Sequence, residues 1–268
     1  MKTAICYFSA TGNSYDIACR LQKKMSDADL FNIADMRIRD LNDYVKIGIV
    51  CPVYWLGPPN IVKRFIHRLR RFKDKYYFAI LTFARMPYSA EYLLQLEFQK
   101  AGLDLHYHYC LKMPESYFVG FMPTPQKNQQ FLFAKADEAV DHTYPDIAAA
   151  LILETPKSLL NMIEKAQKRH EKLAAVLPQF AQKYDVHKNC NGCGICARVC
   201  PVNNIEIKEH LPVFGDQCEG CMACFHRCPQ NAIHYGKKTL RKGQYINPTI
   251  DIAQLDKQRL TEPVDSND

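Results

Sequence analysis

The N-terminal part of the chain alternates short apolar runs with segments of helical amphipathic spacing. Apolar runs of this kind are typical of strands buried on both faces of a parallel sheet. Behind the first run, Ile17, Ala18, Leu21 and Met25 recur at helical spacing. The alternation predicts an α/β domain whose sheet is covered on both faces. The predicted strands are 2–8, 29–33, 45–53, 76–83 and 104–111, and the predicted helices begin after residue 14 and span 61–72 and 88–101.

Two loops in this pattern carry candidate chemistry. Residues 9–14 read SATGNS and join the first strand to its helix. Small hydroxyl residues with a glycine at a helix N-terminus bind phosphate through backbone N–H groups and the helix dipole, although an ordinary capped turn is the alternative. Residues 54–59 read YWLGPP and bring Tyr54 and Trp55 ahead of a helix that two prolines can start. These aromatic rings offer flat surface to a ligand, or simply pack.

SATGNS resembles the phosphate loop of flavodoxins, and YWLGPP occurs where flavodoxins place the loop beside the isoalloxazine ring. The resemblance implies a doubly wound, five-stranded parallel sheet in the order 2-1-3-4-5 with FMN at the carboxyl ends of the strands. It also implies that Tyr54 and Trp55 lie against the flavin and that Gly57 lets a backbone carbonyl turn toward the ring. The FMN-binding residues expected from it are Ser9, Ala10, Thr11, Gly12, Asn13, Ser14, Pro52, Val53, Tyr54, Trp55, Leu56, Gly57, Phe83, Ala84 and Arg85.

The loop after the fourth strand departs from the flavodoxin pattern. Related domains usually carry a glycine-rich loop there, whereas residues 82–90 read TFARMPYSA without a glycine. Arg85 and Met86 stand where close backbone approach to the flavin is expected. One hypothesis places Arg85 near the pyrimidine edge, where it would stabilise an anionic reduced flavin and raise its potential. The alternative is an arginine that points outward from a loop that closes differently.

Eight of the twelve cysteines form two copies of one motif near the C-terminus. Residues 190–201 read CNGCGICARVCP and residues 218–229 read CEGCMACFHRCP, each C-x2-C-x2-C-x3-C-P. The similarity continues past the cysteines, where Ile205 and Ile233 occupy equivalent positions. The segment is therefore an internal duplication, and we expect a pseudo-twofold axis. Three closely spaced cysteines can wrap one side of a 4Fe-4S cubane from a single loop, so the fourth must come from elsewhere.

Iron and sulfide are favoured over zinc by this motif. Zinc also takes four cysteines, but structural zinc modules bring their ligands as two separated pairs. Residues 185–236 resemble a two-cluster bacterial ferredoxin over their whole length, with glycines at 192, 194 and 220 where backbone passes close to sulfide. The resemblance implies that the fourth cysteine of each copy binds the other cluster. The expected ligands are Cys190, Cys193, Cys196 and Cys228 for cluster I and Cys218, Cys221, Cys224 and Cys200 for cluster II.

The remaining segments connect and terminate these two modules. Residues 112–127 are rich in proline, glycine and aromatic residues and predict a long loop over the flavin or the domain junction. Helical character returns in 126–142 and 157–184, and the tail beyond 237 is expected to be loosely ordered. Cys6, Cys19, Cys51 and Cys110 are expected to be buried apolar residues. The predicted domains are 1–150 for FMN, 151–184 as a helical connector, 185–236 for the clusters and 237–268 as a tail.

Charge and composition limit the classes of function that the sequence favours. The net charge of +7 over 268 residues comes mainly from residues 63–75, KRFIHRLRRFKDK. Apolar residues such as Phe65 and Leu69 recur there at helical spacing, so the basic residues are expected on the solvated face of a helix. No nucleic-acid motif accompanies them, although the stripe could dock an acidic redox partner. No run approaches the roughly 18 apolar residues of a membrane helix and no signal peptide is evident, which predicts a cytoplasmic protein without a membrane span.

The whole chain resembles the flavodoxin-ferredoxin fusion proteins of anaerobes. The resemblance implies electron transfer between two 4Fe-4S clusters and FMN, and onward to protein redox partners. A self-contained reductase of a small-molecule acceptor, with the clusters as electron inlet, is the alternative, and a redox sensor is a third class. The sequence contains no nicotinamide fingerprint and no effector domain, which favours the electron carrier.

Overall fold

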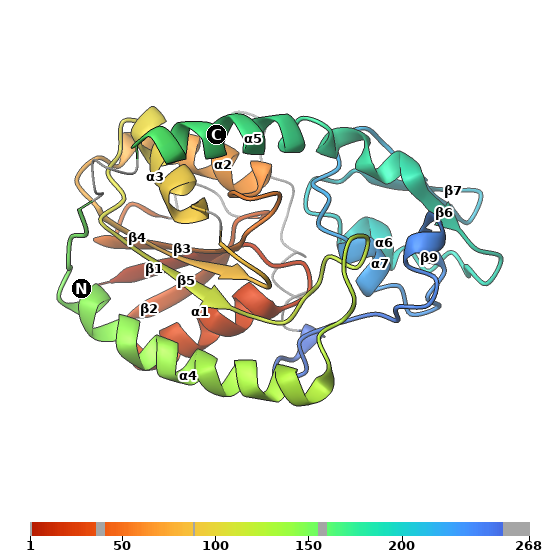
Figure 1. The fold of residues 1–268 in the computed structure, drawn as a ribbon, viewed down its shortest axis with the longest axis horizontal. Coiled ribbons are helices and arrows are strands. Elements are labelled where there is room, and N and C mark those ends of the chain that lie inside the picture. Colours follow the sequence, from red (N-terminus) through yellow and green to blue (C-terminus); the bar gives the residue numbers. More distant parts are fainter. Residues whose placement is uncertain (1, 36–40, 88, 155–159, 254–268) are drawn as a thin grey trace.

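The computed structural model describes residues 2–35, 41–87, 89–154 and 160–253, and its larger domain is built on one parallel sheet (Figure 1). The strands lie in the order β2-β1-β3-β4-β5, so the predicted doubly wound topology is confirmed. Every neighbouring pair is parallel, which brings the carboxyl ends of all the strands to one edge. The strands are β1 (Thr3–Tyr7), β2 (Ala28–Asn32), β3 (Lys46–Pro52), β4 (Tyr76–Phe83) and β5 (Tyr107–Lys112).

Helices cover both faces of this sheet (Figure 1). α1 (Asn13–Lys24) and α4 (Gln126–Ala148) lie on one face, and α2 (Asn60–Arg68) and α3 (Ala90–Lys100) lie on the other. A further helix, α5 (Leu160–Ala174), runs along α3, where Lys100 Nζ lies 3.9 Å from Glu171 Oε1. Among the described residues, no helix combines the length and apolarity needed to cross a membrane.

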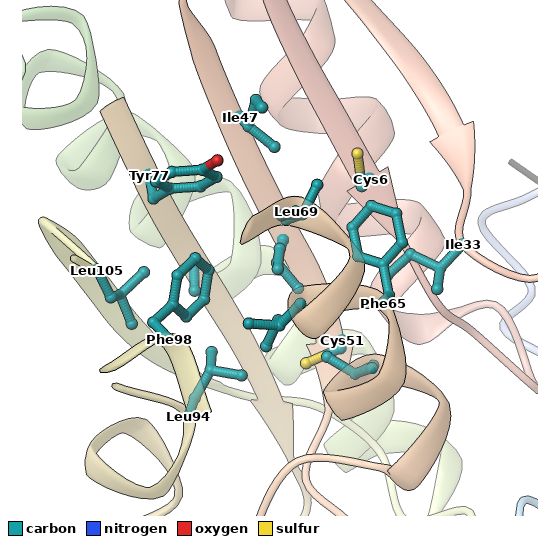
Figure 2. Packing of buried hydrophobic residues seen from close by; sticks show 14 of the residues in the cluster. Cys6, Ile33, Ile47, Cys51, Phe65, Leu69, Tyr77, Leu94, Phe98 and Leu105 are labelled. Carbon is teal, nitrogen blue, oxygen red and sulfur yellow. The ribbon is translucent and has the colours of Figure 1, made fainter. Parts of the chain in front are cut away.

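Residues of each strand alternate between two hydrophobic cores. Cys6 of β1 and Tyr77 of β4 point toward α2 and α3, where Phe65 and Phe98 close the core shown in Figure 2. The next residues along these strands, such as Tyr7, face α1 and α4 instead. This period of two, with both faces apolar, is the reason that the strands appear in the sequence as continuous apolar runs.

The basic stretch forms the outer face of α2 and the turn after it. Ile61, Phe65 and Leu69 are buried in the core, whereas Arg64 and Arg70 are exposed. The predicted amphipathic helix is therefore present, and its charges face solvent because the helix repeat separates them from the apolar stripe.

The smaller domain consists of short elements arranged around the cysteines. β6 (Tyr184–Val186) pairs antiparallel with β9 (Ile233–Tyr235), and β7 (Ile205–Lys208) forms a hairpin with β8 (Leu211–Phe214). The short helices α6 (Ile195–Arg198) and α7 (Ala223–His226) each contain the third cysteine of a motif copy. Ile205 and Ile233, equivalent in the repeat, each begin a strand, so the duplication in sequence corresponds to a duplication in structure.

Two expectations from the sequence require correction. The helical pattern predicted for 157–184 ends as an α-helix at Ala174 and continues as a 3-10 helix over Leu177–Lys183, because Pro178 disfavours α conformation in the residue before it. Residues 155–159 lie outside the described residues.

The tail was expected to be loosely ordered, which is wrong for its first part: Thr239, Tyr245 and Asn247 are buried. Residues 254–268 lie outside the described residues.

The contact between Gly48 and Phe78 tests the packing of the sheet. The two residues are register partners on β3 and β4, and a Cβ on Gly48 would overlap the Phe78 ring. We therefore expect Gly48→Ala to lower the free energy of unfolding by about 1–3 kcal/mol, measured by anaerobic thermal unfolding. Adding Phe78→Leu removes the distal ring atoms and should make the double variant more stable than the sum of the single effects. Strictly additive losses would contradict this packing.

Candidate functional site

The loop of residues 9–14 lies at the carboxyl end of β1 and is braced by its own side chains. The Gly12 N–H donates to Ser9 Oγ at 3.1 Å, and Gly12 has a φ of 97°, which favours glycine. The hydroxyls of Ser14 and Thr82 lie 2.8 Å apart and join the loop to the end of β4. The loop is thereby fixed between α1 and the centre of the sheet.

Several backbone donors of this loop point to an anion. Thr11, Asn13 and Ser14 are buried, yet within the described chain no oxygen accepts their backbone N–H groups. Buried N–H groups without an acceptor are rare in proteins and are usually satisfied by a ligand or water. A phosphate at the N-terminus of α1 would satisfy them, so the residues present fit a flavin phosphate.

The segment after β3 forms a tight turn rather than an open loop. The Tyr54 N–H donates to the Gly57 carbonyl at 2.8 Å, and the Gly57 N–H donates to the Tyr54 carbonyl at 3.0 Å. Trp55 and Leu56 between them have φ values of 52° and 75°, which strains residues with side chains. The carbonyls of Tyr54 and Gly57 are thus both engaged within the turn.

His170 of α5 supports this turn. It is buried, and its Nδ1 lies 2.8 Å from the Trp55 carbonyl oxygen. Burial lowers the pKa of His170, which favours the neutral ring. A Cβ on Gly57 would approach the imidazole to 2.8 Å, so only glycine fits beneath the histidine.

A cavity of about 270 Å³ opens between these loops at the carboxyl edge of the sheet. Its walls come from five segments: the turn after β3, the loop after β4, the segment after β5, Leu173 of α5, and the cysteine loop of the small domain. We call it the junction cavity, since both domains line it. The predicted FMN residues that line it are Val53, Tyr54, Trp55, Leu56, Phe83, Ala84 and Arg85. Pro52 ends β3 beside it, and Ser9 and Ala10 line a separate small cleft that also contains Cys221.

Arg85 reaches the junction cavity but has partners of its own. Its Nε lies 3.6 Å from Glu115 Oε2, and its guanidinium carbon lies 4.0 Å from the centre of the Phe121 ring. Glu115 is buried, and burial raises the pKa of its carboxyl, while N–H donors of Tyr117 and Ser116 lower it. The arginine and the carboxyl therefore form a polar pair in a wall that is otherwise mostly apolar and aromatic.

The eight repeated cysteines gather into two groups that match the crossed arrangement. Cys190, Cys193 and Cys196 share a small cavity with Cys228 of the second motif. Cys218, Cys221 and Cys224 share another with Cys200 of the first motif. Each motif thus contributes three cysteines to one group and one to the other.

The spacing of these thiols suits a cluster better than a single ion. Among the described residues, no three Cys, His, Asp or Glu side chains converge as the ligands of one metal ion would. Four thiolates around a cubane bind different corners of a larger core and need no such convergence.

Backbone and side-chain donors surround the sulfurs. The Asn204 N–H donates to Cys200 Sγ at 3.2 Å, and the Ala232 N–H donates to Cys228 Sγ at 3.3 Å, at equivalent positions of the repeat. The Tyr184 hydroxyl is buried in the cavity of Cys200 and makes no hydrogen bond of good geometry with any described atom. This buried hydroxyl lies beside four thiols and interacts with the Cys224 thiol, so it is placed to donate to a cluster sulfur and the site fits the second cluster.

The two cysteine groups differ in their surroundings. Cys193 of the first group is exposed, whereas Cys221 of the second group lines the junction cavity together with Val53 and Tyr54. Gly220 lies beside it, with the Trp55 indole nitrogen 3.5 Å from where a Cβ would stand. The second group is therefore next to the predicted flavin ring site, and the first is next to solvent.

Glu219 fastens the cysteine loop to the larger domain. Its Oε2 accepts the Ile61 N–H at 3.1 Å in the first turn of α2, and its Oε1 lies 2.7 Å from Arg64 Nη2. A carboxylate at a helix N-terminus satisfies an orphan donor and interacts favourably with the helix dipole. Glu219 is almost fully buried, so the contact is shielded from water.

Besides His170, four features of this site were missed by sequence reasoning. Met222 has a φ of 60° at the position equivalent to Gly194, and its side chain lines the junction cavity. The first motif copy has Gly194 where the second has Met222, and this difference in the sequence could have predicted that the two copies differ in structure here. Tyr184 and Glu219 gave no signal beyond their proximity to the motif, and residues 244–250, which pack on the phosphate loop, gave none.

Comparison with protein families matches both halves of the chain. The family model described as a flavodoxin domain matches residues 4–101, and the model described as a 4Fe-4S dicluster domain matches residues 189–232. No curated protein matches. Flavodoxin from Fusobacterium nucleatum bound to flavin mononucleotide is 16% identical, with 56% of this chain and 99% of that chain covered at a TM-score of 0.41. A Lactobacillus acidophilus flavoprotein in complex with FMN is 19% identical, with 41% and 92% covered at a TM-score of 0.36.

Fold and site together define an electron-transfer protein of the flavin and iron–sulfur type. In particular, the chain joins a flavodoxin domain to a 4Fe-4S dicluster ferredoxin domain, as flavodoxin-ferredoxin fusions do. Its cofactors are FMN and two 4Fe-4S clusters.

The Glu219 contact can be tested by removing each of its partners. Glu219→Ala leaves the Ile61 N–H without its acceptor, so we expect a loss of about 1–3 kcal/mol in the free energy of unfolding. Arg64→Ala removes only a half-exposed ion pair and should cost about 1 kcal/mol or less. Anaerobic thermal unfolding of both variants measures the difference. Equal losses would show that the ion pair, not the helix cap, carries the contact.

The Tyr184 hydroxyl should affect one cluster and not the other. We expect Tyr184→Phe to lower the midpoint potential of cluster II by on the order of 40 mV, the one-electron equivalent of a hydrogen bond of about 1 kcal/mol. Cluster I should keep its potential. Redox titration followed by electron paramagnetic resonance separates the two, and an unchanged pair of potentials would remove the hydroxyl as a donor to a cluster sulfur.

Proposed function

We propose that the protein carries electrons between protein redox partners and FMN by way of its two clusters. Cys190, Cys193, Cys196 and Cys228 hold cluster I, and Cys218, Cys221, Cys224 and Cys200 hold cluster II. The loop of residues 9–14 binds the FMN phosphate. The flavin ring lies in the junction cavity, between the turn of residues 52–57 and the loop of residues 83–85. The FMN exchanges two electrons and each cluster exchanges one, so together they link one-electron and two-electron partners.

The observation that carries this proposal is that Cys221 lines the same cavity as Trp55 and Arg85. A predicted cluster ligand and predicted flavin residues thus share one wall, with Gly220 and Met222 completing it. Cys221 and Met222 also line the cavity that holds the four cysteines assigned to cluster II, so the two cavities share these residues.

Differences in exposure support an order of transfer. Cys193 is exposed at the cluster I end, and the β7–β8 hairpin beside it carries the exposed side chains of Leu211 and Val213. Cluster II is enclosed by Tyr184, Glu219 and the larger domain. A protein partner would reach cluster I first, and electrons would pass through cluster II to or from the flavin.

Residues of the chain tune and enclose this path. Backbone donors to Cys200 and Cys228 stabilise the reduced, more negative cluster. Trp55 packs edge to face against both Tyr117 and Phe180, and the rings of Tyr117 and Phe180 lie tilted against each other beside the junction cavity. Arg85 places a positive charge at the cavity, partly balanced by Glu115.

One observation favours a second candidate, a reductase of a small acceptor. Glu115 is a buried carboxyl in the cavity wall, and burial raises its pKa, which makes it a suitable proton donor. A reductase needs such a donor beside the flavin, whereas an electron carrier does not.

Turnover distinguishes the two candidates. Protein purified without oxygen is given reduced ferredoxin as donor and, in turn, quinones, nitroaromatics and free flavins as acceptors. An electron carrier should turn over none of these above the rate without protein, yet should exchange electrons with a second redox protein. Sustained turnover of one acceptor that Glu115→Gln abolishes would replace the proposal with the reductase.

A further inference from the structure

The C-terminal segment of residues 244–250 runs from the small domain back to the phosphate loop (Figure 1). We call it the strap. It lies outside both matched family domains, which end at residues 101 and 232. At its start, Gln244 Nε2 donates to the carbonyls of Phe225 and Cys228 at 2.6 and 2.7 Å. The strap is therefore anchored on the segment that carries cysteines of both groups.

At its centre, Asn247 holds the phosphate loop from outside. Its backbone N–H donates to the Thr11 carbonyl at 2.8 Å, and its side chain is fully buried. The same peptide group that presents the Thr11 carbonyl donates its N–H, that of Gly12, to Ser9 Oγ. That peptide plane is thus fixed at both ends, while the neighbouring N–H groups of Thr11 and Asn13 stay unpaired within the described chain.

Asn247 also binds the carboxylate of Asp16, which lies close to the phosphate loop. Its Nδ2 donates to Asp16 Oδ2 at 3.3 Å, while Arg20 Nε lies 2.9 Å from Asp16 Oδ1. Asp16 stands in the first turn of α1, where a free carboxylate would repel a phosphate. The two donors occupy both oxygens of this carboxylate and partly offset its charge.

Two further strap residues, Tyr245 and Ile250, contact the same loop. The Tyr245 hydroxyl donates to Asn13 Oδ1 at 2.7 Å, and Asn13 Nδ2 donates to the Pro114 carbonyl. The Ile250 side chain packs against Gly12, where a Cβ would overlap it. The strap thus contacts the peptide, the side chain and the glycine of the loop at separate points.

We propose that the strap is part of the flavin site and that Asn247 is a positioning residue that makes this site select FMN over riboflavin. The inference rests on FMN being the cofactor. Asn247 orients the loop whose N–H groups meet the phosphate and makes no contact with the junction cavity, where the ring lies. Its removal weakens binding of the phosphorylated flavin alone, because riboflavin has no phosphate.

The test uses the full chain with both clusters in place and its flavin removed without oxygen. Titration with FMN and with riboflavin, followed by flavin fluorescence, gives two dissociation constants for each variant. Asn247→Ala should raise the FMN constant roughly tenfold or more and leave the riboflavin constant unchanged. Pro248→Ala, at an exposed neighbour, is the matched control and should change neither.

A second variant guards against misfolding. Asn247→Asp keeps the shape and the backbone donor but sets a carboxylate against Asp16, and it should also weaken FMN binding selectively. Eight irons per chain in each variant verify that the small domain is intact. Equal weakening of both flavins, or no change in either, would overturn the proposal. Tighter FMN binding would overturn it too, since the strap would then compete with the phosphate. If the wild-type chain bound riboflavin as tightly as FMN, the inference about Asn247 would be wrong, whereas the proposed electron transfer would still stand.

Discussion

Glu219 stands between two cysteines assigned to cluster II, yet its carboxylate binds the first turn of α2 in the other domain. The cysteine loop can hold its thiols in place and cap this helix at the same time only if the two domains keep a fixed position relative to each other. The burial of Glu219 makes the contact costly to break, because the helix N–H and the carboxylate would both lose their partners. The shared wall of the junction cavity follows from this contact, and the proposed proximity of cluster II to the flavin ring depends on it.

Backbone strain gathers at the same junction. Trp55, Leu56 and Met222 all have positive φ, and conformations of this kind cost of order 1–3 kcal/mol each. Packing compensates: Trp55 lies against Tyr117 and Phe180, and His170 holds its carbonyl. These three residues line the junction cavity, so strained backbone forms part of its wall.

The larger domain was predictable because its signals are local. Continuous apolar runs mark strands buried on both faces, and the order of the sheet follows once the runs alternate with helices. The spacing of the cysteines is readable because one motif occurs twice, and the crossed assignment to two clusters comes from the resemblance to two-cluster ferredoxins. The strap was not, since Asn247 and Tyr245 stand in a polar segment without periodicity and find their partners at the other end of the chain. Glu219 and His170 were missed for the same reason, because their partners belong to another domain or helix.

The central claim is that flavin and clusters exchange electrons within one molecule, and a flash experiment tests it most directly. Light-driven reduction of the bound flavin in the anaerobic holoprotein is followed at flavin and cluster wavelengths together. The account predicts that flavin reoxidation and cluster bleaching proceed at one common rate that does not change with protein concentration. A transfer rate that rises in proportion to protein concentration would mean that electrons pass only between molecules, which would contradict the shared cavity as the path.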